Sequence, residues 1–278
     1  MEIDSVIFAS GGNDSVALVQ TFYEERLADP RLTHVVYSNT GWSAWWWPVR
    51  MNRFRLWVQG LGFNFSEIQS EGMEALIRRK KGWPANRPKF CTYELKIKPA
   101  MEWLELVDSS KETDCFIGIR RAESKERRSW PRVIERSPSH GGRRLIAPMV
   151  EYSEPDRDEV IIRAGWEVLP HRSKECDPCV NANRATFRQL DERDIAKVRQ
   201  NEQATGRNMF RPHRFMGARG IDEVLKWACL SVVGTNHQAR LGVTLVCVEG
   251  ELRRTRIDNP HRLCHSSSSI ASSWTSFL

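Results

Sequence analysis

The sequence predicts an α/β fold with a mostly parallel central sheet of about five strands and a helical C-terminal region. The apolar run 6–9 predicts a buried strand, and the helical spacing of apolar residues from Ser15 onward predicts a helix directly after it. A second apolar run, 33–38, follows at the distance that one intervening helix requires, so these two strands are expected to be parallel. The 278 residues are 40% hydrophobic, which is sufficient for a core.

The remaining elements continue this alternation of strands and helices. Further strands are predicted at the end of 60–68, at 113–118 and at 145–149. Helices are predicted at 49–61, 156–164, 184–205 and 220–228. No apolar run approaches the roughly 20 residues that a membrane span needs, so no membrane partner is expected.

A glycine-containing turn joins the first strand to the first helix. It consists of Ser10, Gly11, Gly12, Asn13, Asp14 and Ser15. Adjacent glycines let backbone N–H groups approach a ligand that any Cβ would exclude, and a helix start adds unpaired N–H donors. Asp14 and Ser15 are expected to cap the helix. The pattern favours an anion site suited to phosphate, with a tight turn that binds no ligand as the alternative.

The loop after the second strand is expected to lie beside this turn, because ligands of parallel sheets bind at the carboxyl ends of the strands. It contains Asn39, Thr40 and Gly41, which are therefore predicted to contact the same ligand. Four tryptophans follow within 42–47. They could stack on a nucleotide base or pack beneath the next helix, and packing is the favoured interpretation because Trp is usually a core or rim residue.

The chain is basic, with a net charge of +7. This charge suits an acidic partner such as a nucleotide or a nucleic acid, with an ordinary basic enzyme as the alternative. Residues 78–81 form a basic run, and 120–144 hold nine Arg or Lys against three Glu. Because the second segment leaves the carboxyl end of a predicted strand, Arg120 and Arg127 are predicted to bind phosphate.

The seven cysteines do not suggest a disulfide framework, because the N-terminus has no charged leader before an apolar stretch and a cytoplasmic protein is expected. Cys176 and Cys179 occupy a Cys-x-x-Cys turn, which brings two thiols close enough to share a metal. Three interpretations remain open for this turn: a [4Fe–4S] cluster, structural zinc, and unligated or redox-active thiols.

Three segments resemble known families. Ser-Gly-Gly-x-Asp-Ser at 10–15 resembles the PP-loop of the adenine-nucleotide alpha-hydrolase superfamily, which grips the pyrophosphate of ATP or a related nucleotide. Cys-Thr-x-x-Leu-Lys-x-x-Pro at 91–99 and Gly-Ile-Arg-Arg-Ala-Glu-Ser at 118–124 resemble the phosphoadenosine phosphosulfate (PAPS) reductase branch. The resemblance covers residues 1–228 and implies a Rossmann-like three-layer sandwich.

The resemblance also implies a ligand and catalytic residues. The ligand would be ATP with Mg²⁺, or PAPS or adenylyl sulfate. Asp14, Lys96 and Arg120 would be catalytic, with Lys96 neutralising phosphate or sulfate; a solvent-facing helix residue is the alternative for Lys96. Asn39 stands where the superfamily often has an aspartate, so this position keeps a hydrogen-bonding group but has no charge.

The turn at 176–179 resembles the Cys-x-Pro-Cys turn of sulfate-assimilating reductases and DNA phosphorothioation sulfur-transfer enzymes, where it helps to hold an iron–sulfur cluster. Cys91 stands where those relatives place another ligand. Cys229 is the leading candidate for a fourth, ahead of Cys115, which lies inside a predicted strand. The C-terminal Glu-Cys-Gly-Leu-His string of the reductases is absent.

Three functions follow as hypotheses. The first is adenylylation-linked sulfur transfer, with nucleic acid as a candidate acceptor and a sulfur-donor protein as partner. The second is thiol-dependent reduction of PAPS or adenylyl sulfate with a thioredoxin-like reductant. The third is nucleic-acid binding by a nucleotide fold without turnover.

The resemblance and the composition together predict three regions. Residues 1–165 would form the PP-loop nucleotide-binding domain, and 166–228 the helical region with the Cys-x-x-Cys turn. Residues 229–278 are Ser-rich toward the end and match nothing in the family, which predicts an atypical, partly disordered tail.

Overall fold

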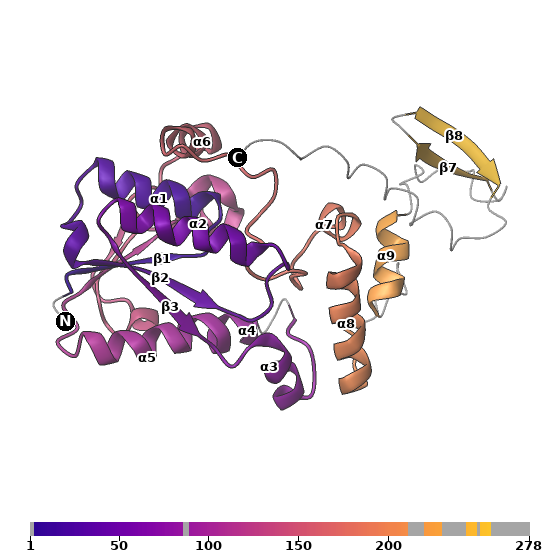
Figure 1. The fold of residues 1–278 in the computed structure, drawn as a ribbon, viewed down its shortest axis with the longest axis horizontal. Helices are drawn as coiled ribbons and strands as arrows, with labels where there is room; N and C mark the ends of the chain where they lie inside the picture. Colours follow the sequence, from indigo (N-terminus) through magenta and orange to yellow (C-terminus); the bar gives the residue numbers. More distant parts are fainter. Residues whose placement is uncertain (1–2, 86–88, 211–219, 230–242, 249–250, 257–278) are drawn as a thin grey trace.

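A computed structural model of the chain describes residues 3–85, 89–210, 220–229, 243–248 and 251–256. Its main feature is a six-stranded sheet of order β3-β2-β1-β4-β6-β5 (Figure 1). All neighbouring pairs are parallel except β5 and β6, so the predicted α/β class with a mostly parallel sheet is confirmed. The strands are β1 (Ser5–Ala9), β2 (Thr33–Asn39), β3 (Asn64–Gln69), β4 (Asp114–Ile117), β5 (Val133–Ile134) and β6 (Leu145–Ile146).

Helices cover both faces of the sheet (Figure 1). α1 (Asn13–Glu24), α2 (Trp47–Gly60) and α6 (Glu154–Arg163) lie on one face, and α5 (Lys98–Val107) lies on the other. Successive strand residues point to opposite faces, so Ile7 packs with the first group of helices and Val6 packs with Leu104 of α5. Both faces of β1 are therefore buried, which is why this strand is continuously apolar.

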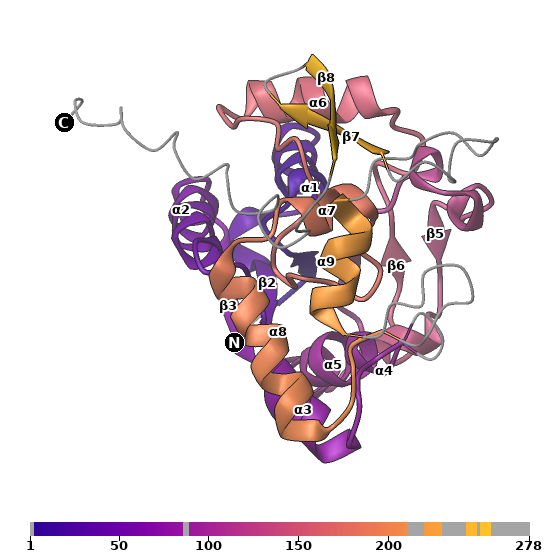
Figure 2. The same ribbon diagram turned by 90° about the vertical axis from the view of Figure 1, so that its right-hand side faces the viewer.

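A second core lies beyond the carboxyl ends of the strands. It contains residues of α3 (Met73–Lys80), α7 (Arg184–Arg188), α8 (Glu192–Thr205) and α9 (Ile221–Cys229). Figure 2 shows α8 and α9 in front of the sheet, at the end toward which the strands run. The helical C-terminal elements thus lie where a parallel sheet binds its ligands.

Shorter elements complete the described chain. α4 (Phe90–Thr92) leads into a π-helix, η2 (Tyr93–Ile97), which continues into α5. The 3₁₀ turns are η1 (Pro30–Leu32), η3 (Arg121–Glu123), η4 (Lys125–Arg127) and η5 (Pro138–His140). β7 (Val243–Val248) and β8 (Glu251–Arg256) form an antiparallel pair within the predicted tail. The rest of 230–278, on which the prediction of disorder falls, lies outside the described residues.

Three predicted elements differ from the structure. The strand expected at 145–149 ends at Ile146, because Pro148 has no N–H to donate to a neighbouring strand. The sheet has one strand more than expected, since the short β5 pairs antiparallel with β6. The helix expected at 184–205 is two helices, because Asp191 accepts a hydrogen bond from the Asp194 N–H and so begins α8 anew.

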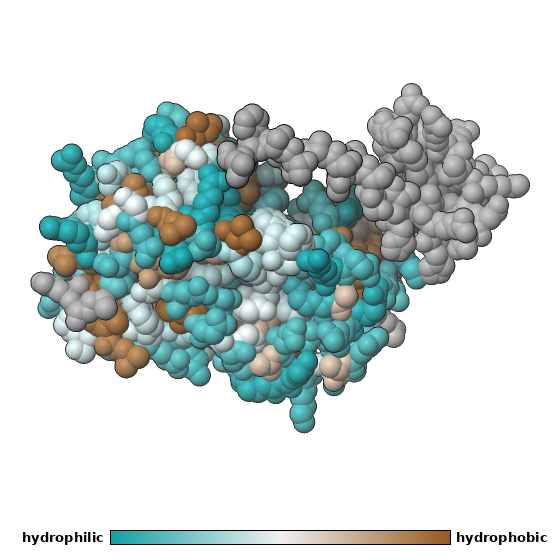
Figure 3. Space-filling view, viewed as in Figure 1, coloured by the Kyte–Doolittle hydropathy of each residue, from teal (hydrophilic) through white to brown (hydrophobic). Residues whose placement is uncertain are grey.

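The surface seen in Figure 3 is mainly hydrophilic, with hydrophobic residues in small separate groups. Single exposed apolar side chains such as Val49 and Leu56 of α2 are ordinary for a globular protein. Within the ranges that the structure describes, no helix has the length and apolar character needed to cross a bilayer.

Arg143 is expected to be essential for stability. Its side chain is completely buried; Nε donates to Asp108 Oδ2 over 2.6 Å and Nη1 donates to Glu105 Oε1 over 2.9 Å. Arg143→Leu leaves the buried Asp108 carboxylate without its cation, which should lower the free energy of unfolding by about 3 kcal/mol or more. Arg144→Leu, which removes an exposed pair with Asp114, should cost about 1 kcal/mol or less. Equal losses in urea unfolding would contradict this account.

Candidate functional site

The turn at 10–15 lies at the point where the direction of strand order reverses. β1 pairs with β2 on one side and with β4 on the other, so the loops that follow β1 and β4 diverge around a crevice. Residues 118–120 leave β4 directly beside the turn. A Cβ on Gly118 would lie 3.0 Å from the carbonyl oxygen of Asp14, so only glycine allows this close approach.

Gly11 and Gly12 fix the course of the turn. Gly11 has φ +68°, and a Cβ there would lie 2.3 Å from Met51 Sδ. The Gly11 carbonyl accepts a hydrogen bond from Arg50 Nε over 2.7 Å. Burial and the neighbouring Arg53 lower the pKa of Arg50 to about 10. Arg50 therefore supports the turn from the α2 side, a contact that the sequence did not indicate.

The start of α1 differs from the expected capping. Gly12 is the N-cap and supplies no side-chain hydrogen bond, so the prediction that Asp14 and Ser15 cap the helix is wrong. Ser15 Oγ instead accepts from the Ser10 N–H over 2.8 Å and closes the turn. The N–H groups of Asn13 and Asp14, the first two of α1, have no intrahelical acceptor and no side-chain cap, which is the arrangement that binds anions at helix starts.

Three arginines surround this helix start. Arg120, which is only 4% exposed, donates from Nε to Asp14 Oδ1 over 2.7 Å across the crevice. Arg127 and Arg172 both pair with Glu123. Burial lowers the pKa of Arg127, and the positive charges of Arg172 and Arg120 lower it further, against the opposite effect of Asp14. This concentration of cations suits a polyphosphate or a sulfated phosphate.

The loop at 39–41 holds neighbouring segments in place. Asn39 Nδ2 donates to Glu67 Oε1 over 2.8 Å, and its Oδ1 accepts from the Gly41 N–H over 2.9 Å. The buried Thr40 hydroxyl donates to the carbonyl oxygen of Glu175 over 3.0 Å. These contacts connect β2 to the segment that carries the Cys-x-x-Cys turn, and a direct nucleotide contact of 39–41 stays a prediction.

Residues 169–179 cross over the turn from far along the chain. The Asn13 side chain forms two hydrogen bonds of 2.9 Å with the backbone of Leu169. Ser173 Oγ donates to the Ser10 carbonyl oxygen over 3.2 Å. Farther along, the Asp177 N–H donates to the Trp42 carbonyl oxygen over 2.8 Å. One segment thus contacts the turn at its start and carries the cysteines at its end.

The contact between Gly12 and Ser173 gives a test of this arrangement. Gly12 has an ordinary extended φ of −80°, so alanine is allowed there, but its Cβ would lie 3.0 Å from Ser173 Cβ. We expect Gly12→Ala to weaken adenine-nucleotide binding about tenfold by displacing the segment. Adding Ser173→Gly should restore affinity, and Gly60→Ala, with open space around it, is the control. Calorimetric titration measures the effect, and failure of the rescue would contradict it.

Cys91, Cys176 and Cys179 line one small, mainly apolar cavity, together with Trp42 and Trp83 among others. Trp42 is buried and donates from Nε1 to the Pro178 carbonyl oxygen over 3.2 Å. The predicted packing role is confirmed for the buried Trp42 and for Trp47 in the main core.

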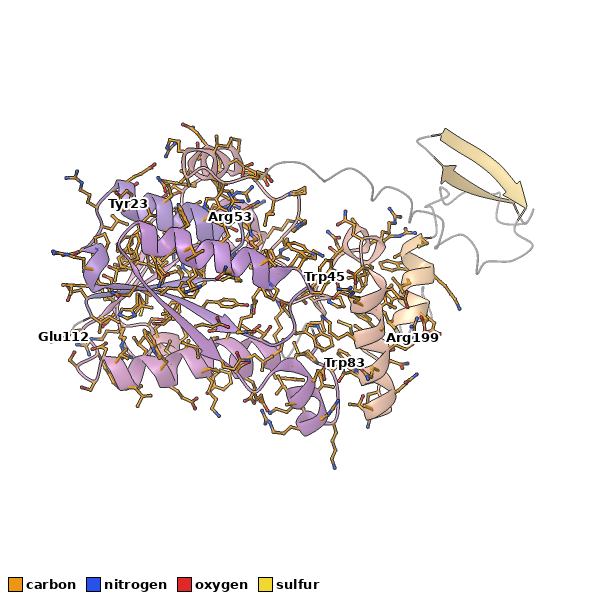
Figure 4. All side chains as sticks on the ribbon, in the orientation of Figure 1. Tyr23, Trp45, Arg53, Trp83, Glu112 and Arg199 are labelled. Atoms are coloured by element: carbon orange, nitrogen blue, oxygen red, sulfur yellow. The ribbon has the colours of Figure 1, made fainter. Side chains whose placement is uncertain are left out.

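Two other tryptophans face α8, as Figure 4 shows for Trp45 and Trp83. Trp45 is 56% exposed and donates from Nε1 to Asp191 Oδ2 at the start of that helix. Trp83 donates from Nε1 to the Arg207 carbonyl oxygen over 2.8 Å. The tryptophans therefore connect the sheet domain to the helices that follow the cysteine turn.

The two thiols of the turn differ in acidity. A hydrogen bond from Cys176 lowers the pKa of Cys179 to about 6 against the effect of burial, helped by the Asn181 N–H and the charge of Lys96. The same hydrogen bond, followed by burial, raises the pKa of Cys176. Burial raises the pKa of Cys91. Lys96 therefore lies close enough to this pair to act on its charge.

The candidate donors for a metal at this site are cysteine thiols. Within the described ranges, no three His, Cys, Asp or Glu side chains are arranged to hold a single metal ion. Cys115 is buried in the core, and burial raises its thiol pKa to about 12. Cys229 is exposed at the end of α9 and is not among the residues that line the cavity. Cys91, Cys176 and Cys179 line one cavity, so their thiols are the donors that a metal ion or a cluster at this place would use.

A scan against protein-family models finds no match, and a search of curated protein sequences finds none. Solved structures do match. PAPS reductase from Candida auris, solved with phosphate, is 12% identical over 60% of this chain and 75% of its own, with a TM-score of 0.42. The U34-tRNA thiolase NcsA from Methanococcus maripaludis, solved with its [4Fe-4S] cluster, is 13% identical over 81% and 73%, with a TM-score of 0.42.

A third structure is FMN adenylyltransferase from Candida glabrata, solved with FMN and an ATP analogue. It is 12% identical over 57% of this chain, with a TM-score of 0.37, and the match spans 47% of its length. At these identities and scores the likeness carries no argument about activity.

Proposed function

We propose that the chain binds an adenine nucleotide at the turn of residues 10–15 and couples its cleavage to sulfur transfer at the neighbouring cysteines. The observation that carries this proposal is the segment 169–179. It contacts the turn through Leu169 and Ser173 and places Cys176 and Cys179 in the cysteine cavity. An anion site and a site for sulfur chemistry are therefore joined by one short stretch of chain.

With ATP, an acceptor oxygen attacks the α-phosphorus, the bond from that phosphorus to the bridging oxygen breaks, and pyrophosphate leaves. Hydrosulfide (HS⁻) supplied by a donor protein then attacks the activated carbon, the bond from that carbon to the acceptor oxygen breaks, AMP leaves with the oxygen, and the proton on sulfur passes to water, so no net oxidation occurs. The N–H groups at the start of α1 and the cation of Arg120 stabilise the charge on the leaving pyrophosphate. Mg²⁺ would accompany the nucleotide, and Asp14 is the residue of the turn that would help to hold it.

A [4Fe–4S] cluster would be held by Cys91, Cys176 and Cys179. When bound, it supplies a site for sulfur or for electrons beside the nucleotide. Lys96 forms an ion pair with Glu175, and its charge acts on the Cys176 and Cys179 thiols, so it would provide positive charge beside these ligands. A nucleic-acid acceptor is supported by the basic segments 78–81 and 120–144.

Thiol-dependent reduction of PAPS or adenylyl sulfate is a second candidate. It is favoured by the hydrogen-bonded pair of Cys176 and Cys179 beside Lys96. One thiolate would attack the sulfur of the sulfonucleotide, and the adenosine phosphate would leave. The second thiol would then release sulfite and form a disulfide, which a thioredoxin-like reductant returns to two thiols.

Product analysis separates these candidates. Reduced protein is incubated anaerobically with Mg²⁺–ATP and mixed cellular RNA and DNA, or with PAPS alone. Pyrophosphate release from ATP is the expected result. Sulfite release from PAPS, with no pyrophosphate from ATP, would instead support the second candidate function, thiol-dependent reduction. If the protein binds nucleotide but releases neither product, it is a nucleotide-binding protein without turnover.

A further inference from the structure

Glu175 is a buried carboxylate at the centre of the candidate site that the sequence reasoning did not identify. It lies between Ser173, which contacts the turn, and Cys176, which lines the cysteine cavity. Its side chain is only 3% exposed. Its carbonyl oxygen accepts the hydrogen bond from Thr40, so its backbone is tied to the end of β2.

The two oxygens of this carboxylate have different surroundings. Oε2 forms a close ion pair with Lys96 Nζ. Oε1 is buried and has no hydrogen-bond partner. Among the described residues, no other buried carboxylate oxygen lacks a hydrogen-bond partner. A buried acceptor without a partner is costly, so its presence beside Lys96 calls for a structural or functional reason.

Lys96 approaches Glu175 from the opposite side of the site. It belongs to the π-helix Tyr93–Ile97, a geometry that occurs frequently at functional sites. Ser38 Oγ donates to the Lys96 carbonyl oxygen over 3.3 Å and ties this π-helix to β2. The Lys96 ammonium group interacts with the Glu175 carboxylate and with the thiols of Cys176 and Cys179.

We propose that Glu175 is a positioning residue, which holds the Lys96 ammonium group at the boundary between the nucleotide turn and the cysteine cavity. A lysine side chain has many rotamers, and a fixed carboxylate selects the one that brings the ammonium group to Glu175 and near the thiols of Cys176 and Cys179. The assignment rests on the proposed function, because the reaction that Lys96 assists is the one between nucleotide and sulfur.

A double-mutant cycle tests this role. Glu175→Gln keeps the shape of the side chain but removes its charge, and should lower kcat about 100-fold. The Kd for the nucleotide should change by about threefold or less, since the contacts of the turn with phosphate remain. If Glu175 acts through Lys96, the Glu175→Gln/Lys96→Met double variant should be no slower than Lys96→Met alone.

Glu94→Gln is the matched control. Glu94 lies on the same π-helix and pairs with Lys80 over 2.9 Å, away from Glu175. It should retain kcat within about threefold of the wild type. A wild-type kcat in Glu175→Gln, or losses that multiply in the double variant, would overturn the proposal.

Urea unfolding of the wild type, Glu175→Gln, Lys96→Met and the double variant gives a readout that needs no activity. Non-additive losses of stability support the Lys96–Glu175 contact, and additive losses overturn it. If the wild type releases neither pyrophosphate nor sulfite, the proposed function fails, while the unfolding cycle still decides whether Glu175 fixes Lys96.

Discussion

Arg120→Met is expected to lower nucleotide-dependent turnover about 100- to 1,000-fold while the protein stays folded. Arg120 is buried beside β1 and holds Asp14 across the crevice, where the phosphates of a bound nucleotide would lie. A buried guanidinium is already oriented before the reaction, so it stabilises developing charge without reorganising solvent. Pyrophosphate release measures kcat, and thermal unfolding measures the folded state.

Arg121→Met provides the control for this prediction. Arg121 is the next residue, but it pairs with the exposed Glu151 and donates to the Trp130 carbonyl oxygen. Its loss should leave kcat within about threefold of the wild type. Arg120→Lys should be intermediate, because lysine keeps the charge but lacks the fixed donors of guanidinium. Equal losses in Arg120→Met and Arg121→Met would indicate a general effect of charge instead of a specific contact.

The sheet could be predicted because its central strands are short apolar runs separated by helices. The pattern at 6–9 and at 33–38 reflects strands buried on both faces, and the structure places β1 and β2 there. β6 was predicted as part of the strand at 145–149, but its two-residue antiparallel partner β5 could not be predicted in this way, because it has too few residues for a periodic pattern. Their pairing depends on tertiary contacts that local sequence does not express.

The residues of the candidate site also fall into those that the sequence predicted and those that it did not. The turn at 10–15 was predictable because close backbone approach requires glycine at defined positions. Arg50, Ser173 and Glu175 were missed because each acts on a partner distant in sequence, and no local motif marks such a contact. The Glu before Cys176 carried one weak signal, an acidic residue beside a Cys-x-x-Cys turn, but only the fold shows that it faces Lys96.

The metal-binding hypothesis leads to the second large effect. Freshly purified, anaerobic wild-type protein is expected to contain about four iron atoms per chain and to absorb broadly near ~400 nm. Cys176→Ala and Cys179→Ala should each reduce iron to less than about one atom per chain, because each removes a thiolate from the cavity. Cys115→Ala should keep the iron, since that thiol belongs to β4 and is buried in the core.

Cys91→Ala and Cys229→Ala decide how the remaining coordination is completed. Cys91 lines the cavity, so its loss should remove iron as strongly as loss of Cys176. Cys229 lies at the exposed end of α9, so it can be a ligand only if that end approaches the cavity. If Cys229→Ala retains its iron, the fourth ligand of the cluster is a group other than the four predicted cysteines. A colourless protein with one zinc atom would indicate that the turn holds a structural zinc ion. A colourless, metal-free protein would indicate that the thiols of Cys176 and Cys179 are unligated and are themselves the reactive groups.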